Sequence, residues 1–153
     1  MRAHDVFKAE LTRAITRIRA FVETLADCAH VDQTETSDYW RLALRPKSLL
    51  ACPVELILYR QQLWDAQIGN EEYVDRRIER IDLFPALVEA IVAGRVVTRT
   101  WRTPGTGLLH SVETIVTLPD RTFTDERRIA AVADVVPRAA CVATDRHWLP
   151  YRR

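Results

Sequence analysis

The sequence predicts an α+β fold in which a mainly antiparallel sheet of five to six strands carries two helices on one face. Three observations point to this class: a long apolar stripe with helical spacing comes first, runs of alternating residues follow it, and a second helical stripe at 83–93 separates two groups of such runs. Strands grouped between helices are typical of α+β proteins, whereas parallel sheets alternate strands with helices. The length of 153 residues predicts a single domain over 1–153.

The clearest element is an amphipathic helix over residues 5–29. Its apolar residues recur at alternating steps of four and three, which places them along one side of a helix. The spacing is that of a heptad repeat, and such a stripe packs either on a partner helix or on the protein's own sheet. Both interpretations stay open at this point. The stripe consists of Phe7, Leu11, Ala14, Ile18, Phe21, Leu25 and Cys28.

Polar residues over 32–38 predict a loop after this helix, and three strands are expected to follow it. Residues 40–45, 54–59 and 64–68 alternate between apolar and polar side chains, which is typical of half-buried strands. The links between these runs are short, so the strands are expected to pair antiparallel. Residues 71–81 are highly charged and carry only a weak helical pattern.

A second helix is predicted over 83–93. Asp82 is suited to the N-cap position of this helix. Pro85 falls in the first turn, where backbone N–H groups form no hydrogen bond within the helix, so its missing N–H costs nothing there. Gly94 follows the last apolar residue and is the expected stop. An apolar stripe on this segment indicates that it packs on the sheet. The stripe consists of Leu83, Phe84, Leu87, Val88 and Ile91.

The strongest hairpin signal joins 95–102 to 108–118, two segments rich in Val and Thr. The residues that link them include Pro104 followed by Gly105, a pair that fits the two central positions of a type II turn. A short return strand is expected at 121–124.

Residues 125–136 fit either a helix or a strand. The spacing of Ile129, Val132 and Ala133 favours the helix, but the choice stays open. The tail beyond Arg138 contains so much apolar area, including Trp148, that it is expected to pack as an extended arm or a short strand.

Several kinds of site are excluded by their missing patterns. The chain has four glycines and neither Gly-rich phosphate-binding motif, and it lacks the HExxH and GxSxG signatures. Its four histidines are scattered and its three cysteines are isolated, so no metal site and no cofactor are predicted. A net charge of +1 does not favour nucleic acid as a partner. No apolar run could span a membrane and no signal peptide is evident, which together predict a cytoplasmic protein.

Candidate catalytic residues lie on two of the expected strands. His110, Ser111 and Glu113 are close in the chain, but strict alternation points His110 away from the other two. Glu55 and Tyr59 share one face of another strand. On the concave face of a curved sheet, a His near a carboxylate would perform acid–base chemistry. The candidates for such a pocket are His110, Glu113, Glu55 and Tyr59; the alternative is that they are ordinary sheet or core residues.

A second group of candidates combines arginine with an aromatic side chain. Arg95, Arg99 and Trp101 share one face of an expected strand. Arginines beside an exposed aromatic ring bind anions or stack on bases, but arginine stems also simply cover apolar sheet surface. These three are therefore candidate binding residues, and the structural interpretation remains open.

The sequence thus predicts a small cytoplasmic binding or interaction module that self-associates, with a homodimer or another protein as its partner. The heptad-like stripe, four tryptophans in a small chain and the missing catalytic signatures support this hypothesis. The alternative is a small-ligand-binding protein or enzyme with a pocket on the concave face of the sheet. The sequence leaves open whether any reaction is catalysed.

Overall fold

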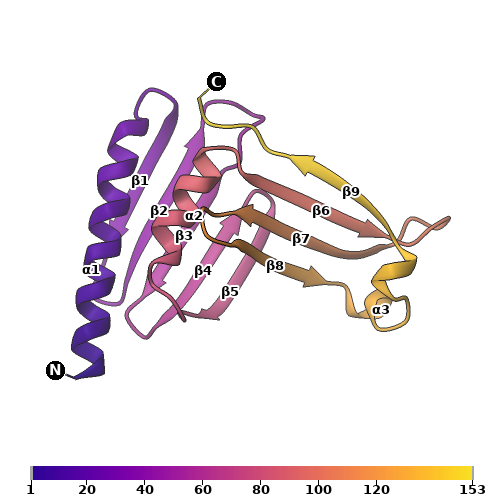
Figure 1. Ribbon diagram of the computed structural model, residues 1–153, viewed down its shortest axis with the longest axis horizontal. Coiled ribbons are helices and arrows are strands. Elements are labelled where there is room, and N and C mark those ends of the chain that lie inside the picture. The colour runs from indigo at the N-terminus through magenta and orange to yellow at the C-terminus, as the bar shows by residue number, and fades with distance from the viewer. Residues whose placement is uncertain (1, 153) are drawn as a thin grey trace.

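Two antiparallel sheets and two main helices form the fold of this chain (Figure 1). The structure is a computed structural model, and it describes residues 2–152. The predicted α+β class is confirmed. Within the described residues, however, nine strands are divided between a sheet of five and a sheet of four, where the sequence predicted one sheet of five to six.

The first sheet is a meander in which each strand pairs with the next one in the chain, in the order β1-β2-β3-β4-β5. Such pairing needs only short turns between strands. Apolar side chains alternate along β3, so that its residues are buried and half-buried in turn, as expected for a strand with one covered face. The strands are β1 (Ala29–Glu35), β2 (Tyr39–Pro46), β3 (Val54–Tyr59), β4 (Leu63–Ile68) and β5 (Glu71–Arg77).

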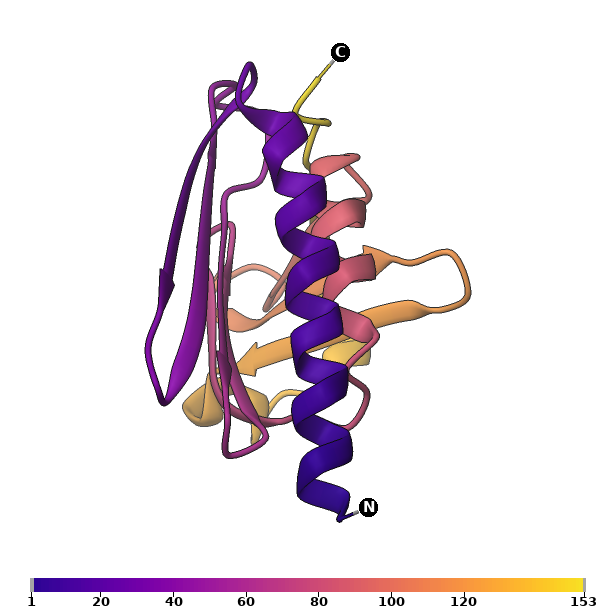
Figure 2. The same ribbon diagram turned by 90° about the vertical axis from the view of Figure 1, so that its left-hand side faces the viewer.

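Both main helices cover the same face of this sheet (Figure 2). Helix α1 (Ala3–Val22) continues into a short 3-10 turn (Glu23–Leu25), and helix α2 (Leu83–Val92) packs beside it. Their apolar stripes meet the inward side chains of β2, β3 and β4 in one core. Burial of this kind is the main favourable contribution to folding. The predicted arrangement of two helices on one face is therefore found.

The second sheet extends sideways from the first, beyond α2 (Figure 1). Its strand order is β8-β7-β6-β9, so the last strand lies next to the first and forms an outer edge. Residues between β8 and β9 form two short helical turns that lie near β7. The elements are β6 (Val96–Arg102), β7 (Leu109–Thr117), β8 (Thr122–Arg128), α3 (Ala130–Ala133), η2 (Arg138–Ala140) and β9 (Val142–His147).

Polar contacts join the second sheet to β5 of the first. The Tyr73 hydroxyl lies 2.5 Å from Oγ1 of Thr114, and both side chains are fully buried. Arg127 donates two hydrogen bonds to the buried carboxylate of Glu71 (2.9 and 3.2 Å). Because these groups are paired, they are buried without the large penalty of an unsatisfied polar group.

The C-terminal segment after β9 forms contacts with both sheets and with α2. Trp148 is buried, and its indole N–H donates to Thr98 on β6 (2.9 Å). The backbone of Tyr151 donates to Val92 of α2, while its hydroxyl donates to Cys52 beside the first sheet (2.7 Å). The predicted extended arm is thus a strand followed by a buried segment.

Several element boundaries differ from the prediction. Helix α1 ends at Val22, so the end of the predicted 5–29 helix is a 3-10 turn followed by the start of β1. The predicted loop at 32–38 is mostly β1, an edge strand whose polar side chains from Asp32 onward are exposed. Of the charged segment 71–81, residues Glu71–Arg77 form β5, and the rest is a loop leading to α2. Residues 125–136 divide between β8 and the single turn α3, so the favoured long helix is wrong.

Candidate functional site

His110 lies in a β-bulge, which places its side chain differently from the prediction. The pairing of β6 with β7 shifts between Trp101–Ser111 and Arg102–Leu109, and His110 is the extra residue. A bulge interrupts the alternation of side chains along a strand. Nδ1 of His110 consequently lies 2.7 Å from Oγ of Ser111, so the prediction that the two point to opposite faces is wrong.

Both nitrogens of the His110 ring have partners inside the protein. Nε2 lies 2.9 Å from the backbone oxygen of Val136, in the segment that follows α3. His110 is 3% exposed and Ser111 is completely buried. A buried imidazole with both nitrogens occupied holds its neighbours in place, and no substrate reaches it in this conformation. The pair therefore anchors the α3 segment to β7.

Glu113 belongs to a local cluster around Arg138. The guanidinium of Arg138 lies 4.0 Å from the Glu113 carboxylate and is hydrogen-bonded to Glu126 on β8. It also lies over the ring of Trp101, 5.2 Å from its centroid. Carboxylates and an aromatic face around one guanidinium are typical of a structural arginine site. This cluster covers one face of the second sheet.

Glu55 and Tyr59 lie on the first sheet, on the face that the helices leave uncovered. Nε of Arg41 donates to Glu55 (3.0 Å), and the Tyr59 hydroxyl donates to Asp65 (2.8 Å). The hydrogen bond to the Asp65 carboxylate raises the pKa of Tyr59 to about 12, because ionisation would place two negative charges side by side. The partners of both residues come from neighbouring strands of the same sheet.

The structure therefore separates the four candidate residues into two groups. Glu55 and Tyr59 bond within the first sheet, whereas His110 and Glu113 bond within the second. General acid–base catalysis needs its groups within hydrogen-bond reach of one substrate. These two pairs do not share such a position.

Arg99 and Trp101 are also engaged inside the second sheet. Arg99 donates two hydrogen bonds to Asp145 on β9, at 2.7 and 2.9 Å. This contact holds the pKa of the Asp145 carboxyl below its usual range. Trp101 lies beneath Arg138, and Arg95 is an exposed residue just before β6. Of the three predicted binding residues, only Arg95 is exposed, whereas Arg99 and Trp101 are half-buried.

The heptad-like stripe of α1 packs on the protein's own sheet. Its central residues are almost completely buried in the common core, so they are not available to a partner helix. The interpretation that the stripe forms an intermolecular coiled coil therefore loses its support. The buried members are Leu11, Ala14, Ile18, Leu25 and Cys28, while Phe7 and Phe21 are partly buried.

β9 forms one of the two outer edges of the second sheet, and β8 forms the other. The backbone N–H of Trp148 donates to Val96, so the even-numbered residues of β9 are the ones that bond to β6. The N–H and C=O groups of Ala143, Asp145 and His147 consequently point away from the sheet. All six β9 side chains are exposed. Within the described residues, no strand pairs with this edge.

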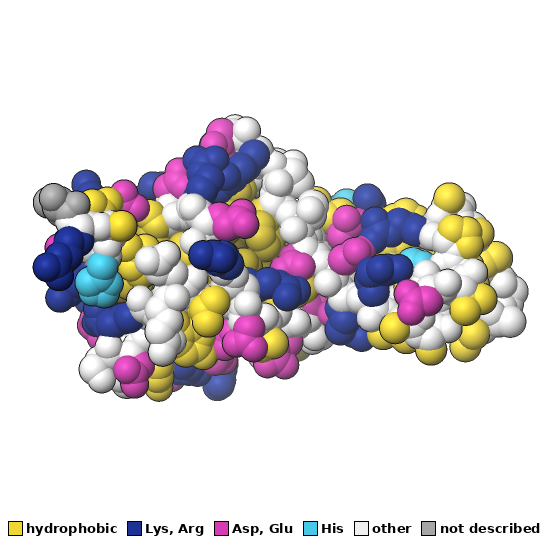
Figure 3. Space-filling view, turned by 90° about the horizontal axis from the view of Figure 1, so that it is seen from below, with side chains coloured by type: hydrophobic (Ala, Val, Ile, Leu, Met, Phe, Trp, Pro, Cys, Tyr) yellow, Lys and Arg dark blue, Asp and Glu magenta, His cyan; other side chains and the backbone are white. Residues whose placement is uncertain are grey.

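Exposed aliphatic side chains lie at both ends of β9. At the far end of the second sheet, hydrophobic side chains gather on the surface (Figure 3). Val142, the first residue of β9, is 59% exposed. Leu108 (55% exposed) lies in the loop between β6 and β7, so β6 separates it from β9. At the other end of β9, Leu49 is 90% exposed and Leu50 is 54% exposed. The backbone N–H of Leu149 donates to Leu50 (2.9 Å), so this pair lies on the same outward edge, just beyond β9.

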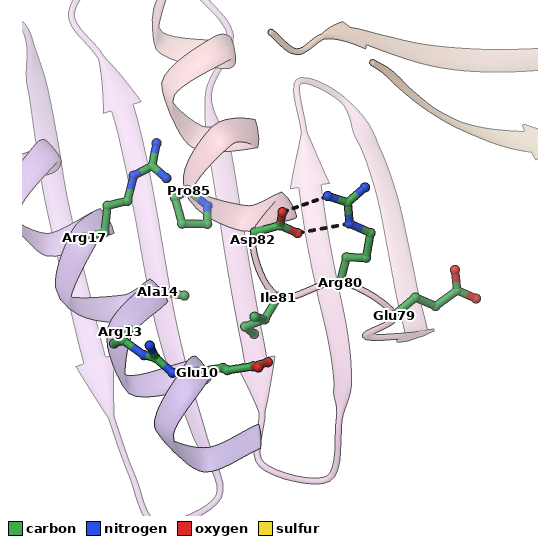
Figure 4. A pocket seen from close by; sticks show the side chains of 9 residues that line it. All are labelled: Glu10, Arg13, Ala14, Arg17, Glu79, Arg80, Ile81, Asp82 and Pro85. Atoms are coloured by element: carbon green, nitrogen blue, oxygen red, sulfur yellow. Dashed lines mark hydrogen bonds and ion pairs between the residues drawn. The ribbon is translucent and has the colours of Figure 1, made fainter. Parts of the chain in front are cut away.

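An open groove of about 530 Å³ runs between α1 and the segment before α2 (Figure 4). Its charges are balanced, with three arginines and three carboxylates. Two of the arginines are already paired: Arg17 donates to Glu89 (2.9 Å), and Arg80 donates twice to Asp82. The groove therefore has no net charge that would select a ligand.

Comparisons with known proteins give no further guide to the site: no protein-family model, curated protein or solved structure matches the chain. Among residues 2–152, no three His, Cys, Asp or Glu side chains gather where they could hold a metal ion. Over the same residues, no helix is both long and apolar enough to cross a membrane.

The β9 edge, all of whose residues are exposed, is not among the candidate sites that the sequence predicts. Its sequence signal is weak, because Val142 and Thr144 are typical strand residues but the charges that follow them are not. Which strand forms the outer edge depends on the pairing order of the sheet. That order is a property of the whole fold.

Proposed function

We propose that this protein is a binding module that self-associates, and that β9 pairs antiparallel with the β9 strand of a second copy. The observation that carries the proposal is the position of the unpaired backbone groups of β9 between the exposed Val142 at one end and the exposed Leu49 and Leu50 at the other. Backbone groups at a sheet edge form a template for another strand. The pairing would join two four-stranded sheets into one continuous sheet.

The charged residues of β9 do not block such pairing. Charged side chains at an edge normally discourage another strand from adding. On β9, however, the Asp145 carboxylate is held by Arg99, and the Arg146 guanidinium lies 3.6 Å from the centroid of the Trp148 ring. Both charges are directed toward the protein's own sheet. The edge therefore lacks the usual protection.

Two-fold symmetry favours a second copy as the occupant. An isologous interface presents the same surface twice, so each end of β9 meets the opposite end in the partner. Antiparallel pairing would place Val142 of one copy toward Leu49 and Leu50 of the other. These three side chains are among the most exposed large apolar residues described, and their burial would add a hydrophobic contribution to strand pairing.

Proline at position 143 tests the interface without disturbing the protomer. The N–H of Ala143 points outward and bonds to no residue of β6, so Ala143→Pro removes only an edge donor. Ala143→Val is the matched control, because it keeps the N–H and suits a strand. Sedimentation velocity on both variants and on the wild type measures the association state, and circular dichroism verifies that each is folded.

We expect a wild-type dimer at high micromolar concentration, a monomer for Ala143→Pro and a dimer for Ala143→Val. A folded Ala143→Pro variant that remains dimeric would place the interface elsewhere and refute the proposal. A wild type that stays monomeric up to millimolar concentration would refute it as well.

A further inference from the structure

The cleft at the N-terminal end of α1 has a one-sided charge. It measures about 370 Å³ and lies between the first turns of α1 and the tips of two hairpins of the first sheet. Its volume is in the range of small-molecule sites, roughly 300–1,000 Å³. It is lined by His4, Phe7, Lys8, Leu11, Ser37 and Arg60.

Three basic side chains surround this cleft, and no carboxylate lines it. His4 and Lys8 form no ion pair with any described residue. Arg60 has one acidic partner, Glu35, at 3.6 Å. The other oxygen of Glu35 already accepts a hydrogen bond from Arg19 at 2.7 Å. One carboxylate is thus shared by two guanidinium groups, which leaves an excess of positive charge at the cleft.

The walls of the cleft supply apolar surface beside these charges. Leu11 is almost fully buried, and Phe7 is half-buried and packs against the core. Ligand sites typically combine such an apolar lining with a few convergent polar groups that fix orientation. In this cleft the Ser37 hydroxyl and the basic groups are the polar members. The complementary ligand has an apolar body and a single anionic head.

We propose that the cleft lined by Phe7, Leu11, Lys8 and Arg60 binds a small organic anion with an apolar body, such as a medium-chain carboxylate or alkyl phosphate. The apolar body would lie on Phe7 and Leu11, and the head would accept hydrogen bonds from Lys8 and Arg60. A guanidinium and an ammonium both donate to carboxylate and phosphate oxygens, the former with two parallel donors. This site is separate from β9.

Titration with octanoate, followed by ¹H–¹⁵N NMR spectra of the full chain, tests this assignment. We expect saturable shifts confined to residues of the cleft, and binding at least about tenfold weaker for uncharged 1-octanol, a difference that corresponds to one charge-assisted contact. Octyl phosphate in a parallel titration identifies the preferred head: tighter binding of either anion supports the site and names its chemistry.

The two lysines of the chain provide a matched pair of variants. Lys8→Glu reverses a charge at the cleft, whereas Lys47→Glu makes the same exposed change in the loop that follows β2. We expect Lys8→Glu to abolish octanoate binding and Lys47→Glu to leave it intact. The assignment is overturned if octylammonium binds as well as octanoate, if Lys8→Glu binds normally, or if no cleft resonance shifts at millimolar octanoate.

Discussion

Replacement of Tyr73 by Phe tests how the two sheets are held together. The Tyr73 hydroxyl and the Thr114 hydroxyl lie 2.5 Å apart, with exposed fractions of 1% and 0%. Tyr73→Phe removes one hydroxyl and leaves the other buried without its partner. An unsatisfied buried hydroxyl costs about 1–3 kcal/mol, so we expect the free energy of unfolding to fall by that amount. Urea unfolding followed by tryptophan fluorescence measures it.

A double-mutant cycle separates this polar contact from simple loss of packing. Thr114→Val removes the second hydroxyl and keeps a similar shape. Because Tyr73→Phe and Thr114→Val together leave neither hydroxyl buried without its partner, the double variant should cost about as much as either single one, a coupling of about 1–3 kcal/mol. If the two single costs add within about 0.5 kcal/mol, the hydroxyls do not interact and the reasoning is refuted.

Two further predictions concern backbone conformation and tyrosine ionisation. Gly94 and Gly105 have nearly equal φ values of +78° and +77°, but only at Gly94 would a Cβ collide with another segment, 2.5 Å from the backbone nitrogen of Pro150. Gly94→Ala should therefore lower the free energy of unfolding by roughly 1–3 kcal/mol more than Gly105→Ala, and equal losses by urea titration would contradict the close packing. Burial raises the pKa of Tyr73 to about 12, and the Asp65 carboxylate does the same for Tyr59. Because the folded-state pKa values exceed the ordinary 10.0, the contribution of these tyrosines to stability is complete below pH 10 and is lost as the pH rises toward 12. At about pH 11, most of the tyrosinate absorbance at 295 nm should therefore appear only after urea unfolds the protein. Full tyrosine ionisation in the folded protein at this pH would refute the prediction.

The parts of the fold that the sequence predicted are those set by local pattern. Both main helices follow from apolar stripes that the protein buries on its own sheet. The hairpin of β6 and β7 follows from its Pro104–Gly105 turn, where Gly105 does adopt a positive φ. By contrast, the sequence does not predict β1 and β5, because their side chains are mostly polar and show no apolar alternation. Such side chains are accommodated by other parts of the fold. The charged Glu71 of β5 is buried against Arg127 of the other sheet.

The candidate sites were harder to predict because they depend on register and pairing order. No residue type in this segment predicts the bulge that brings the His110 ring close to the Ser111 hydroxyl. Glu55 and Tyr59 are separated from His110 because the strands form two sheets. This division depends on which strands pair with one another in the folded chain. The cleft at α1 combines residues far apart in the chain, Lys8 and Arg60, and only the folded arrangement brings them together.

The position of β9 also has a consequence for the folding of the chain, because its partner strand β6 lies far away in the sequence. The first sheet pairs each strand with its neighbour in the chain, so its contacts are local and its loop-closure cost is low. β9 instead pairs with β6, although β7, β8 and α3 all lie between these two strands in the sequence. We therefore expect closure of the second sheet to be a late step in folding. Until it occurs, β6 is itself an unpaired edge, and slow closure leaves the chain exposed to aggregation.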